Sequence, residues 1–187
     1  LKKICNKRKF KIKAIGYVCY KKEFPILSVI LNDIKSFKKT ICFSAGIHGE
    51  EPAGPFAILK FLERFNMNKC KGIKIIIFPV ANPSGFNKSK RRNSKNKDLN
   101  RHFCHTKLFG ENKVLYNFIK NENIFLFHAL HEDEDESKFY LYNFEKTEQE
   151  IYRNIIKLAK KYFPINNNKK IYNDEAINGL IINKKDG

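Results

Sequence analysis

Apolar residues are concentrated in short runs along the chain, and most of these runs have the length of a β-strand. The run IKIIIFPV, residues 73–80, is almost wholly apolar, which is typical of a strand buried on both faces of a sheet. We expect strands at residues 9–20, 24–31, 39–45, 73–80, 124–131, 138–144 and 177–183.

Between these runs the apolar spacing changes to that of a helix. From Pro52 to Phe65 the pattern predicts one helix, and similar patterns predict helices at residues 111–121 and about 146–162. Strands that alternate with helices predict an α/β sandwich with a mixed sheet. The chain of 187 residues has no internal repeat and no linker, so we expect a single domain, residues 1–187.

One long stretch, residues 81–100, contains almost no apolar side chains. A polar loop of this length inside a domain is more often functional or disordered than a simple connection. The segment that ends it, RRNSKNKDLNR, contains Arg91, Arg92, Asn100 and Arg101. Guanidinium groups hold a carboxylate through paired hydrogen bonds, so this loop is a candidate anion site; the alternative is a solvated basic face.

Two further groups lie where predicted strands end, and ligands bind at this edge of an α/β sheet. His48 and Glu51 form an H-x-x-E pair after the strand at 39–45, and His131 ends the strand at 124–131. Two histidines and one glutamate form a complete ligand set for a catalytic zinc, which keeps a fourth position for water. With the arginines, they indicate hydrolysis of an amide next to a carboxylate.

Each of these features also has a simpler interpretation. Glu50 or Glu51 could lie at a helix N-terminus, where negative charge is favoured, and we expect Glu50 to face away from the site. His128 competes with His131, but strand alternation places the two on opposite faces and the strand end favours His131. The acidic run at 132–136 is a solvated turn, a site for a basic substrate side chain, or support for His131.

Composition narrows the range of partners. The formal net charge is +18, but lysines are spread over the chain, which favours a solvated basic surface, and nucleic-acid binding is not expected. Five scattered cysteines without C-x-x-C spacing predict reduced thiols and a cytoplasmic location. No apolar stretch reaches the ~18 residues of a membrane span. Because the chain begins with Leu1 and its only methionine is Met67, we expect a processed product or a fragment of a longer reading frame.

The ordered set HGEEPAG, NPSGF, RRNSKNKDLNRHF, HALHED and FYLY resembles the zinc carboxypeptidase superfamily, carboxypeptidase A-like, which includes the succinylglutamate desuccinylase and aspartoacylase branch. The similarity covers about residues 12–144, and the ordered set is far more specific than any one motif. The resemblance implies a carboxypeptidase-like fold, a three-layer α/β/α sandwich around a mixed, largely parallel central sheet of eight strands.

The resemblance also implies roles for individual residues. It implies a single zinc ion, two residues that grip the substrate's terminal carboxylate, and one arginine that stabilises the oxyanion. The zinc ligands correspond to His48, Glu51 and His131. The residues that grip the carboxylate correspond to Asn100 and Arg101, and the oxyanion arginine corresponds to Arg91. Arg92 is the alternative to Arg91, because the register of the loop is not fixed by the motif.

The chain departs from its relatives in one respect. They carry a glutamate near the C-terminal end of the domain that acts as general base and acid. After His131 the candidates are Glu145, Glu148, Glu150 and Glu175, none of them in an apolar strand. We therefore expect this glutamate to lie beyond the C-terminus, with the domain incomplete there, or the chain to bind metal without efficient catalysis.

The predicted function is that of a zinc metallocarboxypeptidase, which hydrolyses the C-terminal bond of a peptide. One alternative is a deacylase of N-acyl amino acids, as in the desuccinylase and aspartoacylase branch. The other is a non-catalytic module that binds metal and carboxylates. In either enzyme, the substrate is a peptide or N-acyl amino acid with a free carboxylate.

Overall fold

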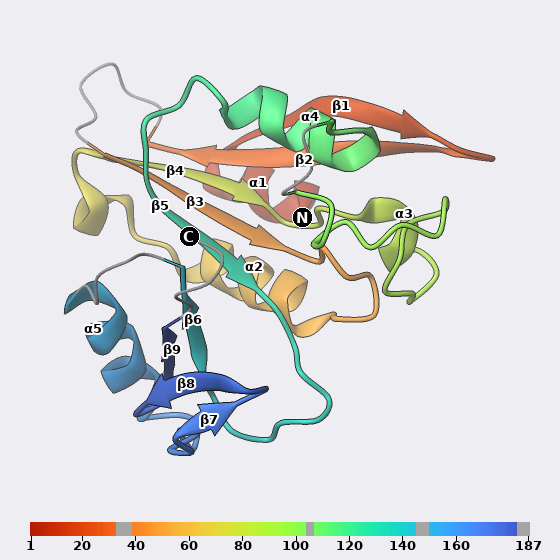
Figure 1. Ribbon diagram of the computed structural model, residues 1–187. Coiled ribbons are helices and arrows are strands. Elements are labelled where there is room, and N and C mark those ends of the chain that lie inside the picture. The colour runs from red at the N-terminus through yellow and green to blue at the C-terminus, as the bar shows by residue number, and fades with distance from the viewer. Residues whose placement is uncertain (33–38, 104–106, 145–149, 183–187) are drawn as a thin grey trace. The chain divides into compact units, whose positions relative to one another are not determined.

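The computed structural model describes residues 1–32, 39–103, 107–144 and 150–182 (Figure 1). The chain consists of two compact units, Leu1–Glu132 and Asp133–Gly187. The described strands form one sheet of five and one of four. No helix in these described ranges is long and apolar enough to cross a membrane.

The first unit contains the five-stranded sheet and five helical segments. Its strands are β1 Lys11–Cys19, β2 Glu23–Leu31, β3 Lys39–Ala45, β4 Ile73–Phe78 and β5 Ile124–Leu130. Its helical segments are α1 Lys2–Arg8, α2 Ala53–Arg64, the 3-10 helix η1 Met67–Cys70, α3 Pro83–Phe86 and α4 Gly110–Ile119.

The sheet of the first unit is mixed, with the strand order β1-β2-β4-β3-β5. β1 pairs with β2, and β2 with β4, in antiparallel fashion, whereas β3 is parallel to both β4 and β5. The carboxyl ends of β3, β4 and β5 therefore meet at one edge. In this register Ala45 pairs with Leu130, so the loops after β3 and β5 begin side by side.

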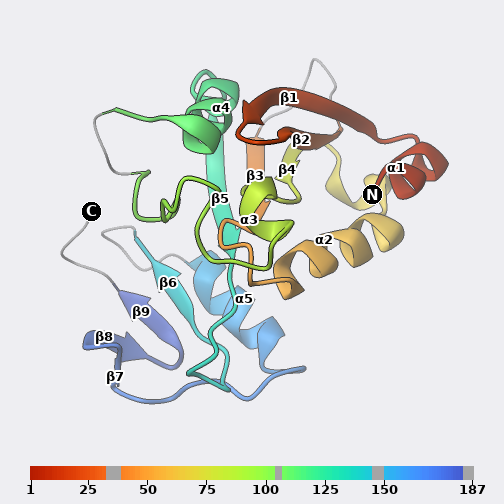
Figure 2. The same ribbon diagram turned by 90° about the vertical axis from the view of Figure 1, so that its right-hand side faces the viewer.

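Helices cover both faces of this sheet, as Figure 2 shows for α2 and α4. Along β4, side chains alternate between the two faces. Ile75 and Ile77 pack in the cluster beneath α1 and α2, whereas Ile76 and Phe78 pack with Leu115 of α4. The first unit thus confirms the expected three-layer α/β/α arrangement around a mixed sheet.

The helix predicted from Pro52 to Phe65 is α2, which spans Ala53–Arg64. Ile58 and Leu62, four residues apart, face the sheet, while Phe56 is 63% exposed. Burying a side chain of this size contributes about 1.5–3 kcal/mol, so this pair anchors α2 to the sheet.

The second unit contains the four-stranded sheet and one described helix. Its elements are β6 Leu141–Asn143, α5 Glu150–Ala159, β7 Lys170–Ile171, β8 Asp174–Ile177 and β9 Leu180–Ile182. The strand order is β6-β9-β8-β7, in which β6 and β9 are parallel and the other pairs antiparallel.

The single strand predicted at 177–183 is wrong, because the chain turns within it. Asn178 and Gly179 have φ of +50° and +80° and connect β8 to β9. An Asn-Gly pair is a strong signal for a two-residue hairpin turn, since both residues tolerate positive φ. The resemblance implies one sheet of eight strands, whereas the described strands form two separate sheets.

Candidate metal centre

The turn after β3 carries the first two candidate ligands, and glycine shapes it. Gly46 has φ of +60°, a conformation that favours glycine. At Gly49 a Cβ atom would lie 2.1 Å from the carbonyl carbon of Gly85, so only glycine allows this contact. The Gly49 amide also donates to the carbonyl oxygen of Lys90 at 3.0 Å. The turn with His48 is thus packed, backbone to backbone, on the start of the polar loop.

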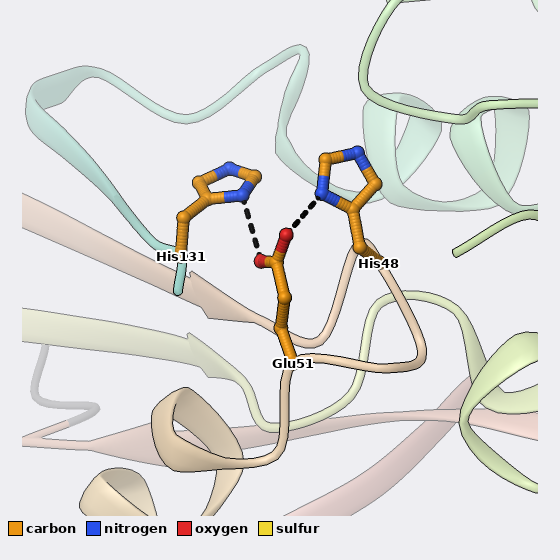
Figure 3. Close-up of side chains that lie close together, drawn as sticks. All are labelled: His48, Glu51 and His131. Carbon is orange, nitrogen blue, oxygen red and sulfur yellow. Dashed lines mark hydrogen bonds and ion pairs between the residues drawn. The ribbon is translucent and has the colours of Figure 1, made fainter. Parts of the chain in front are cut away.

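His48, Glu51 and His131 form a compact cluster at the carboxyl edge of the sheet (Figure 3). One ligand atom from each residue lies within 4.8 Å of the other two. The Nδ1 atom of His48 is 2.6 Å from Oε1 of Glu51, and Nδ1 of His131 is 3.0 Å from Oε2. The Ala45–Leu130 pairing explains why residues so far apart in sequence meet here.

The cluster fits a divalent metal ion by its donor chemistry. Glu51 is buried, and both of its oxygens face imidazole nitrogens. Burial alone would raise the pKa of Glu51, but hydrogen bonds from His131 and His48 and their positive charge hold it at about 2. Glu51 is therefore a carboxylate, the form that binds metal. The side chain of His131 is 33% exposed, which leaves the cluster accessible on that side.

His128, the competing histidine, lies outside the cluster. It packs edge-on against Phe43, the residue that it pairs with in β3. Burial, with a smaller contribution from the charge of His131, lowers the pKa of His128. The structure therefore agrees with the expectation that His131, and not His128, points toward the site.

Asp98 connects the cluster to the polar loop, and the sequence analysis did not identify it. Its Oδ1 atom lies 3.3 Å from Nε2 of His48 and accepts hydrogen bonds from the amides of Asn100 and Arg101. Its Oδ2 atom accepts a hydrogen bond from Nε of Arg91 at 3.1 Å. Burial opposes ionisation, but the Arg101 amide and the charges of His48 and Arg91 prevail and lower the pKa of Asp98. Hydrogen bonds to the Asp98 carboxylate from the amides two and three residues ahead are typical of an Asp in a loop, but no sequence signal indicates its contact with His48.

The candidate arginines differ in how they are held. Nη1 of Arg91 lies 3.7 Å from Oε1 of Glu51, and its side chain is 42% exposed. Arg92 instead donates to the backbone oxygen of Asn96, within the loop itself. The Arg101 side chain is 80% exposed, with Nε 3.9 Å from Asp98. Of the two candidates Arg91 and Arg92, Arg91 is therefore the one that lies beside the cluster.

Glu50 does not face away from the site, contrary to expectation. Its Oε2 atom accepts a hydrogen bond from the Arg91 amide at 3.1 Å, and its Oε1 atom lies 3.7 Å from Nη1 of Arg91. Because Gly49 brings the two segments together, Glu50 reaches the polar loop and helps to place Arg91.

The polar loop is anchored by a buried network around Asn93. Its Nδ2 atom donates to Oε2 of Glu111 and to the hydroxyl oxygen of Tyr20, both at 3.0 Å. Its Oδ1 atom accepts from the amides of Lys95 and Lys97. Glu111, on α4, is fully buried and also accepts from the Tyr20 hydroxyl at 2.7 Å. The loop that carries Arg91 and Asp98 is thus held by buried hydrogen bonds in addition to the apolar packing of Leu99.

Asn93→Ala is expected to lower the free energy of unfolding by about 1–3 kcal/mol, because it removes the hydrogen bonds of a buried side chain to Glu111 and Tyr20. Urea denaturation measures this change. Hydrogen exchange at the Lys95 and Lys97 amides should accelerate at the same time. Asn68→Ala, at an exposed asparagine, is the matched control. Unchanged stability and unchanged exchange in Asn93→Ala would contradict this role.

Two of the four glutamate candidates for a general base lie among the described residues. Glu150 begins α5 and Glu175 lies in β8, both in the second unit, while Glu145 and Glu148 lie outside the described residues.

Comparisons with known proteins agree with this geometry. The profile of the succinylglutamate desuccinylase/aspartoacylase catalytic domain matches residues 38–139, more than half of the chain. No curated protein sequence matches significantly.

Several solved structures have the same fold. A Shewanella denitrificans OS217 protein named as a metallopeptidase has 27% identity and a TM-score of 0.82, covering 99% of this chain and 70% of its own. A similarly named Shewanella amazonensis SB2B protein has 21% identity and a TM-score of 0.82, covering 99% and 73%. A metallo-carboxypeptidase from Burkholderia cenocepacia has 16% identity and a TM-score of 0.76, covering 98% and 52%.

The segment matched by the family profile contains all three residues of the cluster, together with Arg91 and Asp98. The chain belongs to the succinylglutamate desuccinylase/aspartoacylase catalytic-domain family, within the zinc carboxypeptidase superfamily.

Proposed function

We propose that this protein is a zinc-dependent hydrolase that cleaves an amide bond next to a free carboxylate. The observation that carries the proposal is the cluster of His48, Glu51 and His131 with Arg91 beside it. Family membership supports a hydrolase of the metallocarboxypeptidase and deacylase type.

Zinc is the metal that best suits these donors. Two imidazole nitrogens and one carboxylate leave a coordination position open, the arrangement of catalytic rather than structural zinc sites. Zinc bound there would lower the pKa of a water molecule and polarise the substrate carbonyl. His48 and His131 would each offer Nδ1, and Glu51 a carboxylate oxygen. Asp98, at Nε2 of His48, would fix the orientation of that ring.

The charged groups of the polar loop would act on the substrate. Asp98 holds Nε of Arg91, which leaves other guanidinium N–H groups near the cluster for the oxygen that becomes negative during amide hydrolysis. Asn100 and Arg101 would bind the terminal carboxylate of the substrate. The backbone amides of Asn100 and Arg101 donate to Asp98, which also accepts from Arg91. One carboxylate therefore positions the anion-binding residues and the oxyanion arginine.

Two substrate classes follow from the relatives. We favour a peptide with a free C-terminus, because structures with the same fold are named as metallopeptidases and carboxypeptidases. The second candidate is an N-acyl amino acid, favoured by the family profile, which is that of desuccinylases and aspartoacylases.

Metal analysis and a substrate comparison test this proposal. The protein is expected to bind one zinc ion per chain, measured by competition with a chromogenic chelator. It should release an amino acid from a peptide with a free C-terminus but not from the C-terminal amide. N-acyl amino acids tested in parallel distinguish the second candidate. A protein that does not bind zinc would overturn the proposal.

A further inference from the structure

We propose that Glu132 is a positioning residue that fixes the distance between two of the metal ligands, Glu51 and His131. It does so by joining the start of α2 to the end of β5. The inference rests on the proposed zinc site and adds to it a residue that binds neither metal nor substrate.

The side chain of Glu132 caps α2 from a distant part of the sequence. The helix begins after Pro52, whose side chain makes no capping hydrogen bond. The first amide of the helix, that of Ala53, instead donates to Oε1 of Glu132. A carboxylate suits this position, because it accepts from an unpaired helix amide and its negative charge interacts favourably with the helix dipole.

The backbone of Glu132 makes a second contact, with a ligand directly. Its amide donates to Oε2 of Glu51 at 3.2 Å. The same oxygen lies 3.0 Å from Nδ1 of His131. Two successive residues after β5 therefore converge on one oxygen of Glu51. Glu132 thus connects to this segment at two points: its side chain accepts from the Ala53 amide, and its own amide donates to the Glu51 side chain. Together with the His131 contact, these hydrogen bonds hold residues 51–53 against residues 131 and 132.

Packing at Gly54 brings the two segments close enough for these hydrogen bonds. A Cβ atom on Gly54 would lie 3.1 Å from Cβ of Leu130 and 3.2 Å from Cβ of Ala45. The first turn of α2 therefore lies directly on the last residues of β3 and β5. At this separation a glutamate side chain spans from residue 132 to the amide of Ala53.

The other interpretations of Glu132 agree less well with these contacts. A solvated turn would leave its carboxylate free, whereas one oxygen is bound to the helix start. A role in binding a basic substrate side chain would have to compete with that same hydrogen bond. Among the described residues, the metal-binding cluster consists of His48, Glu51 and His131, without Glu132.

Zinc affinity of three variants tests the inference. Glu132→Ala removes the cap, and Glu132→Gln keeps an acceptor oxygen but removes the charge. Glu63→Ala is the control, since it removes an exposed glutamate from the same helix. Zinc affinity is measured by chelator competition, the geometry of the site by the visible absorption of bound Co²⁺, and folding by circular dichroism of the metal-free protein.

Glu132→Ala is expected to lose about 10–100-fold in zinc affinity and to alter the Co²⁺ spectrum, as for other partners of metal ligands. Glu132→Gln should retain the wild-type Co²⁺ spectrum and lose at most about fivefold in affinity, the scale of a partly exposed charge interaction. Glu63→Ala should have the zinc affinity and the Co²⁺ spectrum of the wild type.

Two results would overturn the inference. If folded Glu132→Ala keeps wild-type affinity and Co²⁺ spectrum, the cap is only structural. If Glu132→Gln binds zinc as weakly as Glu132→Ala does, the charge of Glu132 rather than its hydrogen bond sets the zinc affinity. A wild-type protein that binds no zinc would instead refute the proposed function, and the positioning role would fall with it.

Discussion

Glu51→Ala is expected to abolish detectable zinc binding, with a loss of affinity greater than about 100-fold. Residues that only orient metal ligands already contribute 10–100-fold, so removal of a direct ligand must cost more. Glu51 also stands between the two histidines, and its removal takes away the group that both Nδ1 atoms face. Hydrolytic activity should be lost together with the metal.

The measurement is a chelator competition on wild type, Glu51→Ala and the control Glu63→Ala, whose glutamate lies exposed on α2. Metal-free Glu51→Ala should retain its secondary structure by circular dichroism, because the sheet and both helix layers are held by apolar clusters that do not include Glu51. A folded Glu51→Ala protein with wild-type zinc affinity would place the metal elsewhere and contradict the assignment.

Arg91→Ala is expected to lower kcat by about 10²–10³ while zinc affinity stays close to wild type. This is the usual cost of removing one group that stabilises an oxyanion. The guanidinium of Arg91 lies beside Glu51 but makes its hydrogen bond to Asp98, so the metal ligands lose no hydrogen bond. The loss should therefore appear in turnover and not in metal content.

The neighbouring arginine provides the matched control. Arg92→Ala should lose little activity, because Arg92 donates to the carbonyl oxygen of Asn96 and not toward the cluster. Arg91→Lys should restore activity only in part, since lysine keeps the charge but not the planar set of donors. A larger loss of kcat in Arg92→Ala than in Arg91→Ala would assign the oxyanion role to Arg92 instead of Arg91.

Much of the fold follows from local patterns in the sequence. The apolar runs predicted β3 and β4, because strands at the middle of a covered sheet are apolar on both faces. The apolar run of β5 predicted a strand as well, although β5 lies at the edge of the sheet. Helix α1 was not predicted, since Lys2–Arg8 has few apolar residues and its burial depends on Cys5 packing in the cluster beneath α2. The hairpin at Asn178 was missed because the apolar run on either side was interpreted as one strand.

The candidate site was predictable where residues occupy strand ends, and not where they act through long-range contacts. His48, Glu51 and His131 follow two parallel strands whose ends coincide, so the pattern alone brought them together. Asp98 lies in a loop without periodicity, and its role appears only when its contact with His48 is known. Glu132 is one of several acidic neighbours, and nothing local distinguishes it from Glu134.

The backbone contact between Gly49 and Gly85 has a consequence for sequence variation in the family. Any side chain at position 49 would overlap the main chain of residue 85, and main chain cannot rotate aside as a side chain can. Position 49 should therefore accept only glycine wherever the segment at 85 follows the same path. A relative with a larger residue there must route that segment differently, and with it the start of the loop that here carries Arg91.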